Sequence, residues 1–182
     1  MTQARADIPA ARVLLVGMMG AGKTSVGTAL ARMTGWPFLD NDLLVKKATG
    51  IAARELLNHH GEGKLRDAES AALTEGLRVA PPVIVDVAGG IVTRADDRRR
   101  LREAGFVVWL RARIDTLVQR VGRGGDRPWL GDDPEGALRR LYEGREPLYL
   151  EVADHVVDVD DVTPEQVAAA IVDALRGPAS RS

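Results

Sequence analysis

Residues 17–24, which read GMMGAGKT, constrain the fold more than any other stretch of the chain. They follow an apolar run at residues 13–16 and precede an amphipathic stretch at residues 25–33. A G-x-x-x-x-G-K-[ST] segment between a strand and a helix is typical of a phosphate-binding loop. Its glycines let backbone N–H groups surround phosphate oxygens, and the next helix points its positive end at the same anion. The sequence therefore predicts that the chain binds a nucleoside triphosphate.

Side chains within this loop have separate predicted roles. Lys23 can reach the β- and γ-phosphates, and the Thr24 hydroxyl can bind Mg²⁺. A glycine-rich turn with an unrelated lysine is the competing interpretation, and the flanking strand and helix argue against it. The residues of this segment that we expect to bind ATP are Gly20, Ala21, Gly22, Lys23, Thr24 and Ser25.

The other apolar runs predict an α/β fold. Strands are expected at residues 13–16, 37–39, 83–87, 106–110 and 155–159, and helical patterns lie between them. Since these runs are continuous rather than alternating, they predict about five parallel strands with helices on both faces. Residues 52–60 and 63–79 are expected as separate helices, and Pro147 should kink or end a helix at 135–152.

Length and composition indicate one ordinary globular domain over residues 1–182, with frayed ends at about 1–11 and 177–182. The net charge of −1 and the scattered basic residues indicate neither a nucleic-acid nor a membrane partner. No cysteine is present, which excludes disulfides and thiolate chemistry and fits a cytoplasmic protein. We also expect a monomer. Residues 122–134 are rich in glycine and charge, and they predict a mobile lid.

Two aspartates follow the second predicted strand. Asp40 and Asp42 would point the same way as residues i and i+2 of a strand, toward the carboxyl edge of the sheet. Asp40 is a candidate for Mg²⁺, and Asp42 is a candidate to orient or deprotonate an acceptor hydroxyl. The alternative is that both carboxylates cap the helix that begins at Leu43. Asp86 ends the third strand, where a carboxylate of a Walker-B type could stand.

Three arginines and a glycine pair are further candidates. Arg66 lies three residues before Glu69 on a predicted helix, Arg127 lies in the predicted lid, and Arg145 precedes Pro147. Spacing alone does not separate these arginines from the other basic residues, which can be surface ion pairs or solvated loop charges. Residues 89–90 follow a strand, where two glycines allow either a close approach to a ligand or a plain tight turn.

Taken together, these segments resemble the shikimate kinase family over about residues 12–175. The matching segments are GMMGAGKT at 17–24, FLDND at 38–42, GEGKLRDAE at 61–69, AGG at 88–90, RPWL at 127–130 and REPLY at 145–149. The resemblance implies a P-loop fold like that of the nucleoside monophosphate kinases. It also implies transfer of the ATP γ-phosphate to the 3-hydroxyl of shikimate, a step of aromatic amino acid biosynthesis.

The resemblance also assigns roles to individual residues. It gives catalytic roles to Lys23, Asp42 and Arg127. It gives the binding of the small-molecule acceptor to Asp42, Arg66, Gly89, Gly90 and Arg145. ATP is assigned to residues 20–25 with Arg120 against the adenine and the lid residue Arg127. Mg²⁺ is assigned to Thr24, with Asp40 in the outer shell of the metal.

Four positions depart from the family pattern. The family usually has phenylalanine at the positions of Leu57 and Leu65, glycine at that of Ala88 and arginine at that of Asp161. Most of these changes lie on the acceptor side, so a related kinase for gluconate or a cyclitol is a second hypothesis. A nucleotide-binding regulator without catalysis is a third hypothesis. The absence of an Asn-Lys-x-Asp guanine signature from the sequence argues against it.

Overall fold

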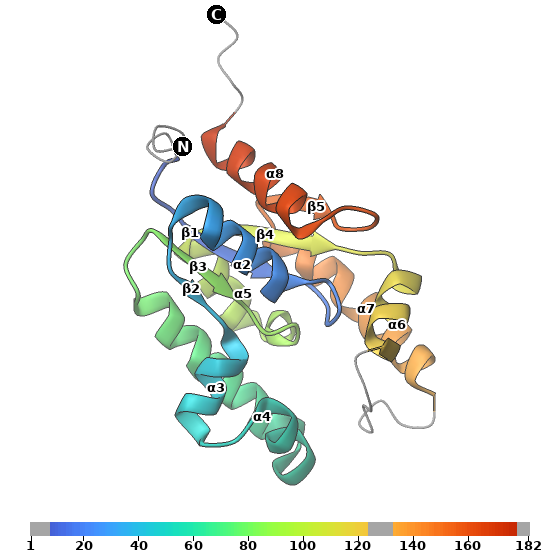
Figure 1. Ribbon diagram of the computed structural model, residues 1–182. Coiled ribbons are helices and arrows are strands. Elements are labelled where there is room, and N and C mark those ends of the chain that lie inside the picture. The colour runs from blue at the N-terminus through green and yellow to red at the C-terminus, as the bar shows by residue number, and fades with distance from the viewer. Residues whose placement is uncertain (1–7, 124–132, 178–182) are drawn as a thin grey trace, which may run out of the picture.

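The computed structural model describes residues 8–123 and 133–177. Within these residues, five parallel strands form one sheet in the order β2-β3-β1-β4-β5 (Figure 1). The strands are β1 (Arg12–Val16), β2 (Phe38–Leu39), β3 (Val83–Asp86), β4 (Phe106–Arg111) and β5 (His155–Asp158). The sequence-based prediction of a five-stranded parallel α/β sheet is thereby confirmed.

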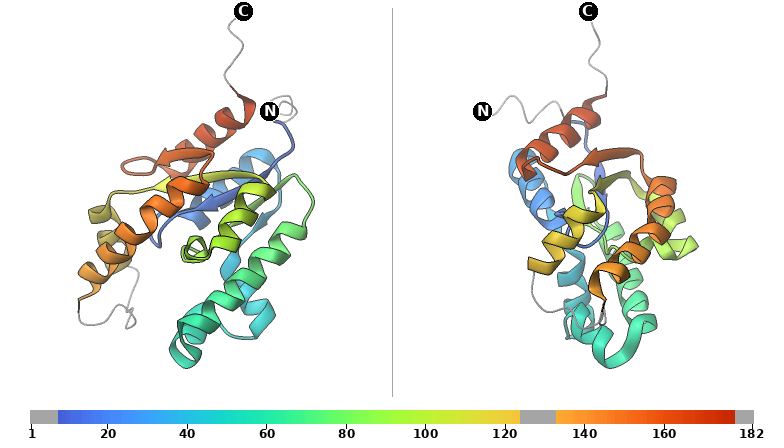
Figure 2. Two further views of the ribbon diagram at one scale, coloured as in Figure 1. Left: turned by 180° about the vertical axis from the view of Figure 1, so that it is seen from behind. Right: turned by 90° about the vertical axis from the view of Figure 1, so that its right-hand side faces the viewer.

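Helices cover both faces of this sheet. They are α2 (Lys23–Thr34), α3 (Asn41–Thr49), α4 (Ala53–Arg78), α5 (Ala95–Ala104), α6 (Ile114–Arg123), α7 (Pro134–Val152) and α8 (Pro164–Arg176), with a 3₁₀ turn η1 (Ile91–Thr93). Helices α2 and α8 pack together on one face, and α5 and α7 pack together on the other (Figure 2). No helix in the described part of the chain is both long and apolar enough to cross a membrane.

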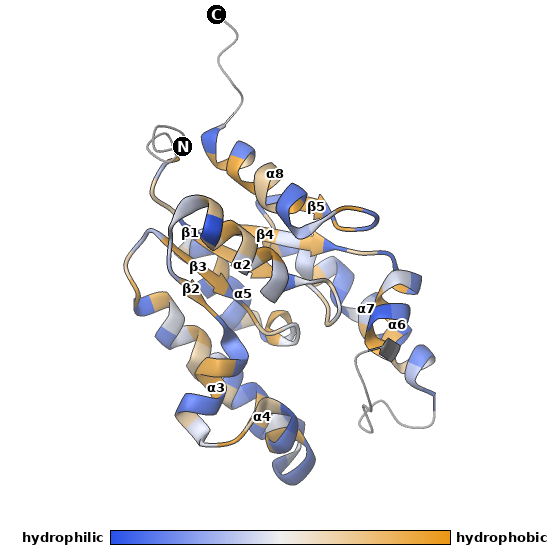
Figure 3. Cartoon of the chain, in the orientation of Figure 1, coloured by the Kyte–Doolittle hydropathy of each residue, from blue (hydrophilic) through white to orange (hydrophobic). Residues whose placement is uncertain are grey.

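The central strand β1 explains why its sequence is uniformly apolar. Leu14 is paired with Val85 of β3 on one side and with Val107 of β4 on the other. Because helices cover both faces, Val13, Leu14 and Leu15 are completely buried. Figure 3 shows the same division, with hydrophobic strands inside and hydrophilic residues on the outer faces of the helices.

Helices α3 and α4 form an arm that extends from the sheet (Figure 1). They pack against each other around a second, smaller apolar cluster that contains Val45, Leu56, Leu65 and Ala72. This cluster is separate from the main core around β1. The arm therefore holds its side chains in place largely by its own packing, and it faces the phosphate-binding edge of the sheet.

Two helix predictions can be compared with the structure. The helices predicted at residues 52–60 and 63–79 are the two segments of α4, and the predicted break between them is confirmed at Gly61, whose φ of 79° and ψ of 172° are not helical. Helix α7 does not end at Pro147 but continues to Val152. Because proline has no backbone N–H, α7 continues past Pro147 without one helical hydrogen bond. Residues 124–132, 1–7 and 178–182, which contain most of the predicted lid and frayed ends, lie outside the described residues.

Candidate active site

The loop between β1 and α2 has the backbone of an anion-binding loop. Gly17, Gly20 and Gly22 have positive φ values of 147°, 82° and 87°, which side chains with a Cβ rarely adopt. Gly22 is the N-cap of α2, and no side chain caps this helix. The first N–H groups of α2 are therefore left for a ligand, and the positive end of the helix favours a negatively charged one.

Lys23, Thr24 and Asp86 lie together at the start of α2. The Lys23 ammonium donates to the Gly17 carbonyl at 3.2 Å and lies 4.0 Å from an Asp86 oxygen. The Thr24 hydroxyl donates to Asp86 Oδ2 at 2.9 Å and lies 3.5 Å from Asp40 Oδ2. Two carboxylates and one hydroxyl are hard oxygen ligands, which is the chemistry that Mg²⁺ prefers.

Asp86 is a buried carboxylate with a perturbed pKa. Burial raises its pKa from 3.8 to about 6, and Lys23 and Thr24 offset only part of this effect. The neighbouring charges of Asp40 and Asp42 raise the pKa further. A bound divalent cation would compensate this concentration of negative charge. The sequence signal for Asp86 was its position at the end of an apolar run, where a carboxylate of Walker-B type could stand.

The structure corrects the predicted geometry of Asp40 and Asp42. Strand β2 ends at Leu39 and helix α3 begins at Asn41, so the two aspartates are not residues i and i+2 of a strand. Asp40 caps α3 by accepting from the Leu43 N–H at 3.1 Å, so the capping alternative is correct for this residue. Asp42 lies in the first turn of α3 and lines the pocket described below.

Arg66 is held in place by two carboxylates of its own helix, α4. It donates to Glu69 at 2.5 Å and to Glu62 at 2.9 Å. Burial lowers the pKa of Arg66, but the two glutamates outweigh burial and raise its pKa above the ordinary value. Burial also raises the pKa of Glu69, and Arg66 partly offsets that rise. A Cβ on Gly90 would lie 2.1 Å from the guanidinium carbon of Arg66, so a glycine is needed there for this arrangement.

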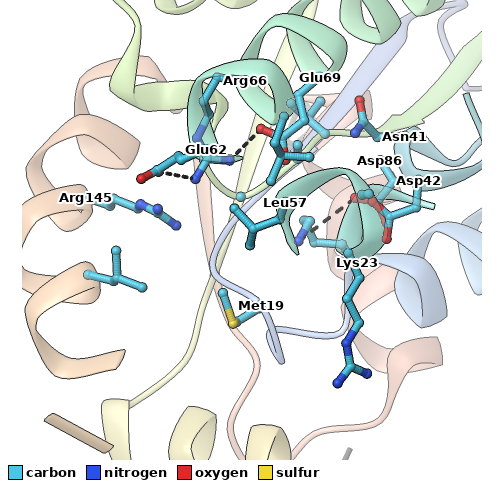
Figure 4. Close-up of a pocket in the computed structure, with 18 of the residues that line it drawn as sticks. Met19, Lys23, Asn41, Asp42, Leu57, Glu62, Arg66, Glu69, Asp86 and Arg145 are labelled. Carbon is cyan, nitrogen blue, oxygen red and sulfur yellow. Dashed lines mark hydrogen bonds and ion pairs between the residues drawn. The ribbon is translucent and has the colours of Figure 1, made fainter. Parts of the chain in front are cut away.

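Arg145 and Gly89 also line the pocket. Arg145 is only 5% exposed although it is charged, and it projects from α7 toward the pocket (Figure 4). Gly89 lies against the phosphate-binding loop, since a Cβ there would be 3.0 Å from the Gly17 carbonyl oxygen. The Tyr149 hydroxyl of α7 donates to the Gly89 carbonyl at 2.6 Å. These contacts place the end of β3 between the nucleotide loop and α7.

One cavity of about 830 Å³ joins these groups. Figure 4 shows Lys23 and Asp42 on one side of it and Arg66 and Arg145 on the other. The predicted site residues that line it are Gly20, Lys23, Thr24, Asp42, Arg66, Gly89, Gly90 and Arg145. It is also lined by Asp86 and by residues that the sequence pattern did not single out, including Met19, Ala53, Arg54, Glu62 and Arg140. The types and spacing of those five residues carry no signal of their own.

The remaining predicted residues lie outside the lining of this cavity or outside the described residues. Ala21 is buried beneath the loop, and Ser25 is exposed in the first turn of α2. Arg120 of α6 donates to the Val159 carbonyl at 3.1 Å and lies 3.4 Å from the Gly20 carbonyl, next to the phosphate-binding loop. Arg127 belongs to residues 124–132, which the structure does not describe.

The cavity thus brings together a phosphate-binding loop, one buried and one partly buried arginine, and an aspartate around a space for a small ligand. The family model that matches this chain is that of shikimate kinase, over residues 19–176. The chain belongs to the shikimate kinase family. A shikimate kinase of Caldanaerobacter subterraneus subsp. tengcongensis is 37% identical over 89% of this chain and 94% of the relative.

Solved structures agree with the family assignment. A shikimate kinase from Acinetobacter baumannii in complex with shikimate is 33% identical, with a TM-score of 0.87 over 94% of this chain and 96% of that one. A gluconokinase from Sinorhizobium meliloti is 21% identical, with a TM-score of 0.58 over 91% of this chain and 93% of that one. The second likeness shows a shared fold alone, whereas the first extends to sequence along nearly the whole shikimate kinase chain.

Proposed function

We propose that this chain transfers the γ-phosphate of ATP to the 3-hydroxyl of shikimate, giving shikimate 3-phosphate and ADP. The observation that carries the proposal is the meeting of two different binding chemistries in one cavity. The loop at Lys23 suits a polyphosphate, and the guanidiniums of Arg66, which is partly buried, and Arg145, which is buried, suit a small carboxylate. Membership of the shikimate kinase family, with a relative solved in complex with shikimate, names the acid.

The residues of the donor half supply positive charge and backbone N–H groups rather than a covalent nucleophile. Backbone N–H groups of residues 20–25 and the ammonium of Lys23 would surround the phosphates. Arg120 lies beside the loop, where the adenine would be expected, and Arg127 would approach from the lid. Since phosphoryl transfer depends mainly on positioning and electrostatic stabilisation, these groups supply what the donor requires.

Thr24, Asp40 and Asp86 would hold Mg²⁺. The Thr24 hydroxyl already contacts Asp86, and Asp40 lies at the edge of the same cluster. A cation held by these residues would supply positive charge against the phosphates of the nucleotide. The buried carboxylate of Asp86 makes the cluster favourable for a cation even though the residue also contacts Lys23.

The acceptor half orients a hydroxy acid. Forked guanidinium donors match the two oxygens of a carboxylate, so Arg66 and Arg145 would fix that end of shikimate. Gly89 and Gly90 line the cavity, so their backbone would approach the ligand closely, and Asp42 lies toward the nucleotide loop. Asp42 would accept a hydrogen bond from the attacking hydroxyl, or take its proton, and so direct its oxygen to the γ-phosphate.

The proposal is tested by ADP release with shikimate as the varied acceptor. Asp42→Asn and Arg66→Ala should each lower kcat/KM for shikimate by at least about 100-fold and leave ATP binding within about twofold. Arg78→Ala is a matched control, because Arg78 lies on the same helix, is exposed and pairs only with the exposed Glu75 among the described contacts. Normal kinetics for shikimate in Arg66→Ala would contradict the assignment.

A substrate panel separates this proposal from its rivals. Turnover with gluconate or a cyclitol in preference to shikimate would favour the second hypothesis, for which the fold alone offers support. ATP binding without turnover on any hydroxy acid would favour a regulator. A single kinase domain, a monomeric state and a cytoplasmic location stay predictions, and sedimentation and fractionation would test the last two.

A further inference from the structure

The Tyr149 side chain joins the two halves of the acceptor site. It is completely buried in α7, and its ring stacks on Trp109 of β4 with ring centres 5.7 Å apart. Packing of that kind would be satisfied by phenylalanine, which has the same ring. The hydroxyl is therefore the part of the side chain that needs a separate explanation, because burying an unpaired hydroxyl is unfavourable.

The hydroxyl makes one short hydrogen bond, to the Gly89 carbonyl at 2.6 Å. Gly89 itself lies against the Gly17 carbonyl of the phosphate-binding loop, where a Cβ would approach to 3.0 Å. The bond therefore ties α7 to the segment between β3 and η1 at the point where that segment meets the nucleotide loop. Movement of this carbonyl would displace the neighbouring Gly90 and the Arg66 guanidinium that packs on it.

The same hydroxyl also lies beside Arg145. Arg145 and Tyr149 are four residues apart on α7, so they lie on one face of the helix. Burial raises the pKa of Tyr149, and the nearby guanidinium of Arg145 lowers it by a smaller amount. A guanidinium at 5% exposure has few directions in which to turn. The Tyr149 oxygen is thus close enough to Arg145 for the guanidinium charge to act on it, while its proton is donated to the Gly89 carbonyl.

We propose that Tyr149 is a positioning residue for binding of the phosphate acceptor. Its single hydroxyl fixes the distance between Arg145 and the backbone at residues 89–90. The inference rests on the proposed function, because Arg145 and this backbone matter only if they bind the acid. Binding of a carboxylate between Arg66 and Arg145 depends on the distance between the two guanidiniums. The Tyr149 hydroxyl lies beside Arg145 and bonds to Gly89, whose neighbour Gly90 packs on Arg66, so it connects the groups that position the two arginines. The nucleotide loop keeps its own backbone contacts without it.

The test compares two substitutions on the same helix. Tyr149→Phe removes only the hydroxyl, and Tyr142→Phe is the matched control, because the Tyr142 hydroxyl bonds to Glu146 of the same helix. In the full-length protein, Tyr149→Phe should raise KM for shikimate roughly tenfold and leave KM for ATP within about twofold. Tyr142→Phe should change neither. Equal KM changes for both substrates, or none for shikimate, would overturn the inference.

A second measurement keeps the inference testable if Tyr149→Phe does not fold. The chain contains two tyrosines, so Tyr142→Phe leaves Tyr149 as the only one. With tyrosine labelled by ¹³C at the ring carbon that bears the hydroxyl, shikimate should shift the single resonance. A resonance that is unchanged at saturating shikimate would overturn the inference. Lack of turnover of shikimate by the unsubstituted protein would instead reject the proposed function, so the two failures are distinguishable.

Discussion

The contact between Gly90 and Arg66 supports a quantitative prediction. In Gly90→Ala the new Cβ would lie 2.1 Å from both the guanidinium carbon and Nη1 of Arg66, and 2.6 Å from Nη2. Ordinary contacts of this kind are about 3.5–4.0 Å, so the guanidinium must move by about 1.5 Å. The backbone of Gly90, with φ −87° and ψ −9°, accepts alanine without strain. The substitution therefore acts on Arg66 rather than on the local backbone.

A displacement of this size changes both stability and acceptor binding. The bonds from Arg66 to Glu69 and Glu62 are 2.5 and 2.9 Å long, and about 1.5 Å more would break them. Glu69 is buried, so its loss of a partner should lower the free energy of unfolding by about 1–3 kcal/mol. A lost charge-assisted bond to the acceptor carboxylate, worth about 1.5–3 kcal/mol, should lower kcat/KM for shikimate about 10- to 150-fold.

The assay is ADP release at saturating ATP with varied shikimate, together with urea unfolding and calorimetric ATP binding. Affinity for ATP should stay within about twofold, since the three atoms nearest to the new Cβ all belong to Arg66 and none belongs to the nucleotide loop. Gly63→Ala is the control, because a Cβ there meets no atom within 4 Å. It should stabilise α4 by about 0.5–1 kcal/mol with unchanged kinetics. If Gly90→Ala keeps kcat/KM for shikimate within twofold, the packing argument is wrong.

Three further predictions concern stability. Gly27→Ala should lower the free energy of unfolding, measured in urea, by about 1–3 kcal/mol, because the new Cβ would lie 2.2 Å from the Phe38 ring. Adding Phe38→Leu should recover part of this loss, and no recovery would contradict the proposed clash. Burial raises the pKa of Tyr142 to about 12 and that of Tyr149 as well, whereas an unfolded tyrosine ionises near 10. Ionisation of the tyrosines should therefore leave the free energy of unfolding unchanged below about pH 10 and lower it above that pH. Phenolate absorbance should appear together with unfolding, and phenolate formation in the folded protein at pH 10 would refute this prediction. Thr163→Ala should cost about 1 kcal/mol in thermal unfolding, because it removes the side-chain cap of α8, and an unchanged midpoint would show that the cap contributes little.

The nucleotide half of the site is where the sequence was most informative. Residues 17–24 are contiguous, and each depends on a local backbone requirement, so their pattern predicts strand, loop and helix together. Uniformly apolar runs such as residues 13–16 predicted a sheet buried on both faces, because burial on both faces leaves no position for a polar side chain. The parallel five-stranded fold follows from such local signals.

Tertiary structure alone decided the acceptor half. Asp42, Arg66, Gly90 and Arg145 come from α3, α4, the segment between β3 and η1, and α7, and no local pattern specifies the distances between them. The spacing of Asp40 and Asp42 after a strand predicted that they point the same way, whereas a helix begins between them and makes Asp40 a cap. The physical reason is the same in each case: backbone preferences are properties of neighbouring residues, whereas a binding site for a small acid depends on side chains that only the packing of helices against the sheet brings together.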